Sequence, residues 1–380
     1  MKSSNCHLCN SKLFPDPILQ LKGMPKAAQF YPDRSEFAED KGITLSIRQC
    51  SICGLVQHKM KPVGYFKEVI TAASLSEKSK LSRLNQMKQF VDKFGLYGKK
   101  VLDIGSGKGE MLDILEEARF IAAGIESSQK SVEIGLSAGR KMINGYIGDL
   151  NVIEGSPFDA FISLNYLEHL PDLSQVILNI YNNLTSNGVG FITVPNLEYL
   201  LKTKCFYEFV ADHISYFTKR TLTYAFEANG FDVLECQIIN EENDIAAIVK
   251  KKEALDISKQ YVEVEALIKN LQQIISDYKS KNKKVAVWGA GHRTLALLAL
   301  SKANDIEYII DSAKFKQAKF TPILHLNIVS PDYLKDKKVD LVIVMVPGLY
   351  PGEVLKTLDK MNLSMDTAIL RDNKIEFIKK

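Results

Sequence analysis

The chain has 380 residues, a length at which two or three domains are expected. Hydrophobic residues make up 46% and charged residues 25%, as in ordinary globular proteins, and a net charge of +4 gives no reason to expect nucleic acid as a partner. The opening MKSSNCHLCNSKLF lacks the apolar core of a signal peptide, and no run approaches the roughly 20 apolar residues that span a bilayer. We therefore expect a cytoplasmic protein without a membrane partner.

Four of the six cysteines form two close pairs near the N-terminus. Cys6 and Cys9 make one C-x-x-C motif, and Cys50 and Cys53 make a second. Two such turns supply the four thiolates of a tetrahedral zinc site, and four thiolates leave no position open for a substrate. The alternatives are redox activity or unrelated thiols. We predict a structural zinc ion in an N-terminal domain of residues 1–80.

Strand-like and helical segments alternate over residues 81–250. VLDIGSG, IAAGIES, FDAFISL and GVGFITV have the composition of buried strands. Such alternation predicts an α/β domain with a doubly wound parallel sheet.

Two further segments complete the chain. Within residues 251–284, apolar residues from Ile257 to Tyr278 recur at steps of four and three, which predicts a linker helix packed along its own protein or, alternatively, a dimerising coiled coil. A monomer and a homodimer both stay open. A second alternating unit, residues 285–380, contains VAVWGAG, IEYIIDS and DLVIVMVP and predicts a second Rossmann-like domain.

The clearest chemical motif is a glycine-rich turn between a strand and a helix. It has the spacing G-x-G-x-G, with an acid two residues before the first glycine, whereas a dinucleotide site more often has G-x-G-x-x-G. The next strand ends in Glu126, whose carboxylate we expect to accept hydrogen bonds from both ribose hydroxyls. We expect Asp149 to bind the adenine amino group and Leu150 to pack on the adenine ring. These features predict a site for S-adenosylmethionine, which has no phosphates. The predicted cofactor-binding residues are Asp103, Gly105, Ser106, Gly107, Gly109, Glu126, Asp149, Leu150 and Leu164.

Methyl transfer requires an aligned acceptor and a base that removes its proton. Histidine suits this task because its pKa lies near neutrality. His169 follows the fourth strand of the central domain, and His213 follows the fifth, at the sheet edge where open α/β sheets bind ligands. The predicted catalytic residues are therefore His213 as base and His169, with Asp212 as a group that orients His213.

The motifs DIGSGKG, GIES, GD and SLNYLEHLPDL resemble those of class I methyltransferases. The paired cysteines, the central domain and the C-terminal VAVWGAGHRT, KQAKFTP and HLNIVSP segments together resemble the sugar C-methyltransferase family. This resemblance implies an enzyme that methylates a nucleotide-linked keto-deoxysugar for antibiotics or surface glycans, through an enolate formed by a histidine base.

The sequence departs from that family's pattern at two places. Its Tyr-x-Glu-His-like run reads Val210-Ala-Asp212-His213 here, and the segment 66–74 has none of the tyrosine expected near the end of the cysteine domain. A sugar O-methyltransferase, which needs a base but no enolate machinery, is therefore the main alternative. An NAD-dependent oxidoreductase and a non-catalytic scaffold are the others.

The C-terminal unit contains part of a dinucleotide fingerprint. Gly289 and Gly291 follow a strand and Asp311 closes the next one, but Thr294 replaces the third glycine. We expect a Rossmann-like domain that contributes surface to the nucleotide-sugar, with His292, Arg293 or Lys319 contacting phosphate. A domain that only completes the fold or a dimer is the alternative.

Overall fold

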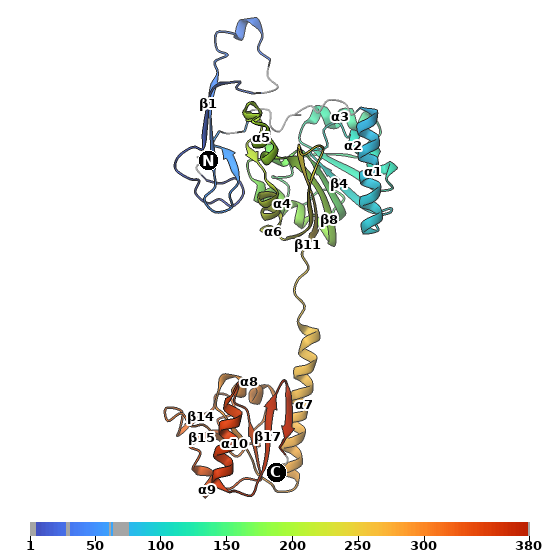
Figure 1. Ribbon diagram of the computed structural model, residues 1–380. Coiled ribbons are helices and arrows are strands. Elements are labelled where there is room, and N and C mark those ends of the chain that lie inside the picture. Colours follow the sequence, from blue (N-terminus) through green and yellow to red (C-terminus); the bar gives the residue numbers. More distant parts are fainter. Residues whose placement is uncertain (1–4, 28–30, 61, 64–75, 379–380) are drawn as a thin grey trace. The chain divides into compact units, whose positions relative to one another are not determined.

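The structure, a computed structural model, describes residues 5–27, 31–60, 62–63 and 76–378. The chain forms two compact units, residues 1–254 and 255–380, and each is folded around its own hydrophobic core (Figure 1). The predicted boundary at residue 80 falls inside helix α1 (Glu77–Phe94). The finer division of the chain into four segments stays a prediction.

A seven-stranded sheet with the order β10-β11-β8-β7-β4-β5-β6 forms the centre of the first unit. The strands from β8 to β6 run parallel, as predicted from the buried runs of apolar residues. The strands are β4 (Lys100–Ile104), β5 (Ile121–Glu126), β6 (Met142–Asn144), β7 (Phe158–Leu164), β8 (Leu184–Pro195), β10 (Phe231–Ile239) and β11 (Asp244–Lys251).

One strand of this sheet, which the sequence analysis did not name, runs antiparallel to its neighbours. β11 pairs antiparallel with both β8 and β10. A parallel pair needs a long crossover connection, and the short link between β10 and β11 allows only a hairpin. Asn240, Glu241 and Glu242 make this turn with positive φ angles. Because none of these turn residues is glycine, the sequence does not indicate a hairpin here.

Helices cover both faces of the central sheet (Figure 1). On one face lie α1, α2 (Glu110–Glu117) and α3 (Gln129–Ser137), and on the other lie α4 (Leu173–Asn182), α5 (Leu197–Thr203) and α6 (Lys219–Glu227). α1 begins where the Ser76 side chain accepts the N–H of Ser79 and ends at Gly95, whose φ is 64°. Three short 3-10 helices complete the unit: η1 (Arg34–Glu36), η2 (Leu167–His169) and η3 (Phe206–Glu208).

A second, antiparallel sheet with the order β1-β2-β3-β9 belongs to the same unit. Its strands are β1 (Leu19–Met24), β2 (Ile43–Gln49), β3 (Val56–His58) and β9 (Ser215–Tyr216). β9 comes from the methyltransferase-like segment, so the cysteine-containing segment and the loop that carries His213 share one sheet. Leu45, Ile47 and Val56 pack there against Leu197 and Leu200 of α5.

The second unit repeats the layered arrangement, with the strand order β14-β15-β13-β12-β16-β17-β18. The strands are β12 (Val285–Trp288), β13 (Ile309–Ile310), β14 (Lys319–Phe320), β15 (Asn327–Val329), β16 (Leu341–Val344), β17 (Asp366–Arg371) and β18 (Lys374–Phe377). The edge strands β14 and β18 run antiparallel to their neighbours. The helices are α7 (Ser258–Ser280), α8 (His292–Leu300), α9 (Tyr333–Asp336) and α10 (Tyr350–Met361). α7 and α8 contribute to one core, and α9 and α10 to the other.

α7 is the helix predicted from the apolar steps in residues 251–284. Leu267, Leu271 and Ile275 in its C-terminal half are buried in the core of the second unit. This packing matches the linker-helix interpretation over that half, while Tyr261 and Val262 in the first half are exposed.

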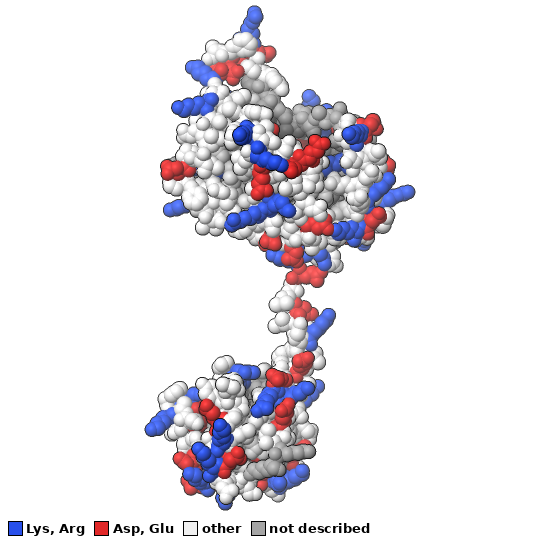
Figure 2. Space-filling model, viewed as in Figure 1, with Lys and Arg blue, Asp and Glu red and all other residues white. Residues whose placement is uncertain are grey.

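Neither the 23-residue α7 nor any other helix in the described ranges has the apolar length that crossing a lipid bilayer requires. Lys and Arg are interspersed with Asp and Glu on the face shown in Figure 2, without a continuous basic patch on that face.

Candidate cofactor and active site

The glycine-rich turn lies between β4 and α2, at the carboxyl edge of the central sheet. β4 pairs with β5 on one side and with β7 on the other, so the strand order changes direction at this point. Ligands bind at such switch points in open α/β sheets. Gly105, Gly107 and Gly109 have φ angles of 72°, 55° and 80°, which L side chains rarely adopt. The backbone can therefore approach a ligand closely here.

Glu126 closes β5 directly opposite this turn. One carboxylate oxygen accepts the N–H of Gly107 at 3.0 Å, and the other accepts the N–H of Ser128 at 2.9 Å. The side chain is 7% exposed. The oxygen bonded to Ser128 also accepts the hydroxyl of Ser127 at 3.3 Å. These bonds fix the carboxylate at the edge of the sheet, and the oxygen bonded to Gly107 keeps a second lone pair for a ligand hydroxyl.

Asp103 lies one strand away and is 4% exposed. Burial, together with the negative charge of Glu126, raises the pKa of Asp103 to about 7. A carboxyl with this pKa can be protonated near neutral pH. The predicted residue Ser106 faces inward instead, because its Oγ lies against Gly124 and 4.0 Å from the sulfur of Met142.

The predicted adenine side of the site lies beyond β6. Asp149 is exposed in a turn, and Leu150 is half-buried against Gly145. Leu164 ends β7 and is also half-buried. The ring of Tyr166, a residue that the sequence analysis did not predict in the site, packs on Gly105. A Cβ atom at position 105 would lie only 2.5 Å from this ring. Burial raises the pKa of Tyr166 well above its usual value, so the phenol stays protonated.

The two predicted histidines lie side by side. The rings of His169, in η2, and His213, in the loop before β9, meet edge to face with centroids 4.7 Å apart. The Nδ1 of His169 lies 2.8 Å from the backbone carbonyl oxygen of Asp212. Because a carbonyl only accepts, Nδ1 carries the proton and the lone pair is on Nε2. Asp212 thus holds His169 through its main chain, a contact that the sequence did not predict.

Burial keeps this histidine pair neutral. It lowers the pKa of His169, and burial with the neighbouring His169 and His58 lowers the pKa of His213 to about 3. A neutral imidazole retains the lone pair that a base or a ligand uses.

His58, at the end of β3, holds the same loop from the other side. Its Nδ1 accepts the N–H of Met60 at 3.3 Å, so its Nε2 carries the proton and donates to the carbonyl oxygen of Ala211 at 3.2 Å. The side chain is fully buried, which lowers its pKa to about 4. Sequence reasoning missed His58 because only the pairing of β3 with β9 brings it to this loop.

Glu168 is the second residue that sequence reasoning left unassigned, although it lies beside His169 in the motif SLNYLEHLPDL. Its Oε1 lies 3.9 Å from the Nε2 of His169, and burial, aided by Asp244, raises the pKa of Glu168 to about 8. Asp244 itself accepts hydrogen bonds from the side-chain amides of Asn165 and Asn240.

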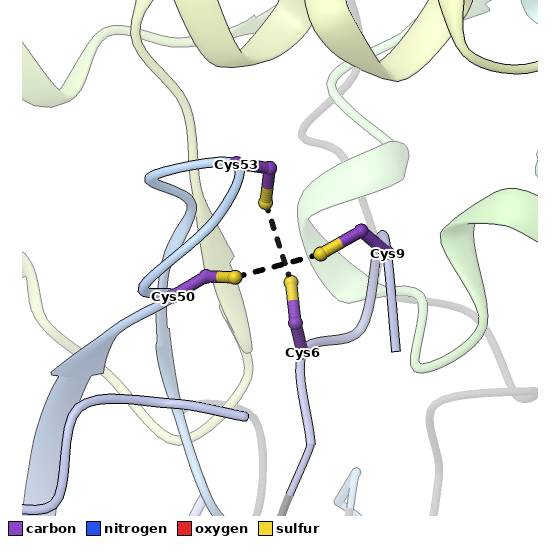
Figure 3. A group of neighbouring side chains, drawn as sticks. All are labelled: Cys6, Cys9, Cys50 and Cys53. Carbon is purple, nitrogen blue, oxygen red and sulfur yellow. Dashed lines mark hydrogen bonds between the residues drawn. The ribbon is translucent and has the colours of Figure 1, made fainter. Parts of the chain in front are cut away.

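The four N-terminal cysteines converge on one point (Figure 3). The sulfurs of Cys6 and Cys53 are 3.5 Å apart, as are those of Cys9 and Cys50. The Cys53 thiol donates to the Cys6 sulfur and lowers the pKa of Cys6 to about 5. Four convergent thiols at such distances form the donor set of a closed tetrahedral metal site. The segment 66–74, where the family tyrosine is missing, lies wholly outside the described residues.

The second unit has two cavities beside the loop after β16. One of about 580 Å³ is lined by Trp288, Asp311, Lys316 and Tyr350, among others. The other, of about 320 Å³, contains Arg293 and Arg371. His292 is exposed, and Lys319 lies on β14 and lines neither cavity.

The residues of the partial dinucleotide fingerprint make hydrogen bonds to other residues of the second unit. Asp311 accepts the N–H groups of Ala290 and Ala313 and the ammonium of Lys316. The hydroxyl of Thr294 donates to the carbonyl oxygen of Met345. The carboxylate that a dinucleotide site would offer to a ribose is thus already paired.

We predict that His58 makes the first unit sensitive to acid. Its pKa is about 4 when folded and about 6.5 when unfolded, so the stability it contributes is complete above pH 6.5 and is lost as the pH falls toward 4. His58→Gln should lower the slope of unfolding free energy against pH in this window by about 1.4 kcal/mol per pH unit. Urea unfolding at a series of pH values measures this slope, with exposed His292→Gln as control. An unchanged slope in His58→Gln would contradict the prediction.

Two protein families match the chain. Residues 79–236 match the family described as methyltransferase domain, and residues 238–363 match the C-methyltransferase C-terminal domain. The second match begins within the first unit, at the end of β10, and extends into the second unit.

Comparison with individual proteins gives the same picture. The chain is 22% identical over 368 residues to the C-methyltransferase NovU of Streptomyces niveus, covering 86% of each chain. It is 29% identical over 112 residues to the ubiquinone biosynthesis O-methyltransferase of Actinobacillus pleuropneumoniae, covering 27% of this chain and 48% of that protein. The magnesium protoporphyrin IX methyltransferase of Synechocystis PCC 6803, solved with bound S-adenosylhomocysteine, is 15% identical with a TM-score of 0.39, and the match covers 50% of this chain and 97% of that one. With the class I fold and the two family matches, the chain is an S-adenosylmethionine-dependent methyltransferase that carries a C-methyltransferase C-terminal domain.

Proposed function

We propose that the enzyme transfers a methyl group to a carbon atom of a nucleotide-linked keto-sugar. The observation that carries this proposal is the similarity to a C-methyltransferase over 86% of both chains, which includes the C-terminal domain as well as the catalytic one. Similarity to O-methyltransferases is confined to about a quarter of this chain. The sugar substrate follows from the family resemblance of the sequence motifs.

The cofactor supplies an electrophilic methyl group on a sulfonium. Glu126 would accept a hydrogen bond from the ribose with the lone pair that Gly107 leaves open on one carboxylate oxygen. Asp149 and Leu150 would contact the adenine. The burial of Asp103, next to Glu126, limits the negative charge at this edge because its pKa is raised to about 7.

His213 would act as the base. Removal of the proton on the carbon next to the ketone would leave an electron pair on the acceptor. That pair would form the new bond to the methyl carbon as the bond from this carbon to the sulfonium sulfur breaks and the neutral thioether leaves. A base must be unprotonated before it reacts, and burial keeps His213 in that state. His169 packs against His213 with its own ring fixed by Asp212, so it orients the base or the substrate.

Oxygen methylation is the second candidate, favoured by one observation. Val210 occupies the place of the tyrosine in the family's run, so that position supplies no phenol to stabilise an enolate. The nearby phenol of Tyr216 is bonded to the backbone N–H and carbonyl oxygen of Val210. A hydroxyl acceptor needs only the base.

The second unit would contact the nucleotide. Arg293 and Arg371 line the same cavity, and a guanidinium pair suits phosphate because its planar fork makes two parallel hydrogen bonds. The larger neighbouring cavity has room for a base or a sugar beside Trp288.

We propose that the four cysteines hold a structural zinc ion. The Cys50–Cys53 turn leads directly into β3, which pairs with β9 and carries His58. A metal there would anchor the strand that holds the loop of His213.

We predict that Glu126→Gln weakens S-adenosylhomocysteine binding about 10- to 100-fold, because hydrogen bonds to a charged group contribute about 1.5–3 kcal/mol. Isothermal titration calorimetry gives the dissociation constant. Glu133→Gln, an exposed change on α3, is the control and should bind normally. Equal affinity in the Glu126 variant would remove Glu126 from the cofactor site.

We predict that His213→Ala lowers kcat at least about 100-fold on nucleotide-linked keto-sugars, because a positioned base contributes 10²- to 10⁴-fold. Cofactor affinity should be unchanged. Methyl transfer is measured over a panel of keto- and hydroxy-sugar nucleotides by mass spectrometry, with exposed His325→Ala as control. Full turnover by His213→Ala rules out the base role. A product methylated on oxygen selects the second candidate.

We predict that purified protein contains about one zinc equivalent and that Cys50→Ser loses it, because the site then has three thiolates. Inductively coupled plasma mass spectrometry measures the metal. Cys205→Ser, which lies outside the cluster, should keep its zinc. Equal metal content in both variants contradicts the assignment.

A further inference from the structure

Three side chains at the edge of the central sheet form a second group of potential metal ligands. Glu168 and His169 come from η2, and His213 comes from the loop before β9. One ligand atom from each residue lies within 4.8 Å of the other two. Two imidazoles and one carboxylate on one side of an ion are a donor set that divalent transition metals take, with the remaining positions open.

Glu168 indicates that a positive group is missing from this place. The residue is 2% exposed, and its Oε2 has no hydrogen-bond partner among the residues that the structure describes. A buried carboxyl oxygen without a partner is costly, so each such atom in a native protein needs an explanation. A bound cation provides one.

His169 is already arranged as a metal ligand would be. Its Nδ1–H donates to the Asp212 carbonyl oxygen at 2.8 Å, which leaves the lone pair on Nε2, the atom that lies 3.9 Å from Oε1 of Glu168. Metal-binding histidines almost always make such a bond with the ring nitrogen that does not bind the metal. His213 packs on this ring with a centroid distance of 4.7 Å and is only half-buried, so its side of the group can be reached by a ligand.

We propose that Glu168, His169 and His213 bind one divalent transition-metal cation. Ligand atoms about 2.1 Å from one ion are about 3 Å apart, so side-chain rotations of about 1–2 Å close the group from its present spacing. The ion has nitrogen and oxygen ligands and no thiolate, which favours Mn²⁺, Co²⁺ or Zn²⁺ over softer cations.

The consequence for catalysis rests on the proposed function. A cation at this site takes the lone pair with which His213 would accept the proton of the substrate. Occupancy and the base role therefore exclude each other, and the cation-loaded enzyme is inhibited.

The test is a titration of the full-length protein, isolated with its own metal content, with Mn²⁺ followed by electron paramagnetic resonance. Mn²⁺ is a poor ligand partner for four thiolates, so the cysteine site does not contribute. We expect one site in the wild type and at least a tenfold weaker affinity in Glu168→Gln. This isosteric change should fold normally, because burial keeps Glu168 largely protonated in the metal-free protein.

Glu133→Gln is the control. It makes the same Glu-to-Gln change at an exposed carboxylate on α3, outside the group of three ligands. It should bind Mn²⁺ like the wild type. His213→Ala, a change at a half-buried position, is a second test variant and should also bind at least tenfold more weakly.

Equal Mn²⁺ affinity in the wild type, Glu168→Gln and His213→Ala overturns the metal site and leaves the proposed function untouched. If Mn²⁺ binds, a saturating concentration should lower the rate of methyl transfer at least tenfold. Removal of Mn²⁺ with a chelator should restore that rate. Binding with undiminished methyl transfer overturns the inhibition and, with it, the assignment of His213 as base.

Discussion

The loop of residues 210–214 is the constraint on which the active site depends, because it joins the two sheets of the first unit. His58 donates to the carbonyl of Ala211, and His169 donates to the carbonyl of the next residue, Asp212. The N–H of Ile214 bonds to the carbonyl oxygen of Glu168. Each histidine carries a proton on the nitrogen that donates, and His58 must also be neutral because its Nδ1 accepts the N–H of Met60. Burial disfavours the charged form of both rings, since a charged imidazole would lose hydration in this interior.

This arrangement links the cysteine segment to catalysis through the backbone. Cys50 and Cys53 lie immediately before β3, and β3 both carries His58 and pairs with β9. A metal at the four sulfurs would therefore act at a distance, by fixing a strand and not by touching the substrate.

Asp103, Glu126 and Glu168 are among the acidic residues that lie buried along the carboxyl edge of the central sheet. They meet the cost of burial in different ways. Glu126 is paired with two backbone N–H groups, whereas burial raises the pKa of Asp103 and Glu168 to about 7 and about 8. Protonation or a bound cation removes the cost of burying a negative charge at Asp103 and Glu168. Perturbed groups of this kind are typical of functional sites, and Glu168 is the one for which the methyl-transfer mechanism has no use.

The sequence by itself determined the class I methyltransferase fold, because near-continuous apolar runs and a glycine turn with positive φ angles are local properties. It also placed the four cysteines in two tight turns and both histidines after adjacent strands. The reversed strand β11 escaped prediction because the hairpin turn of Asn240, Glu241 and Glu242 contains no glycine. Only tertiary structure decided that His58 and Glu168 join the histidine pair. The contact of His58 depends on the pairing of β3 with β9, which are more than 150 residues apart. Glu168 neighbours His169 in the chain, but only the fold decides that both side chains are buried and that their pKa values shift.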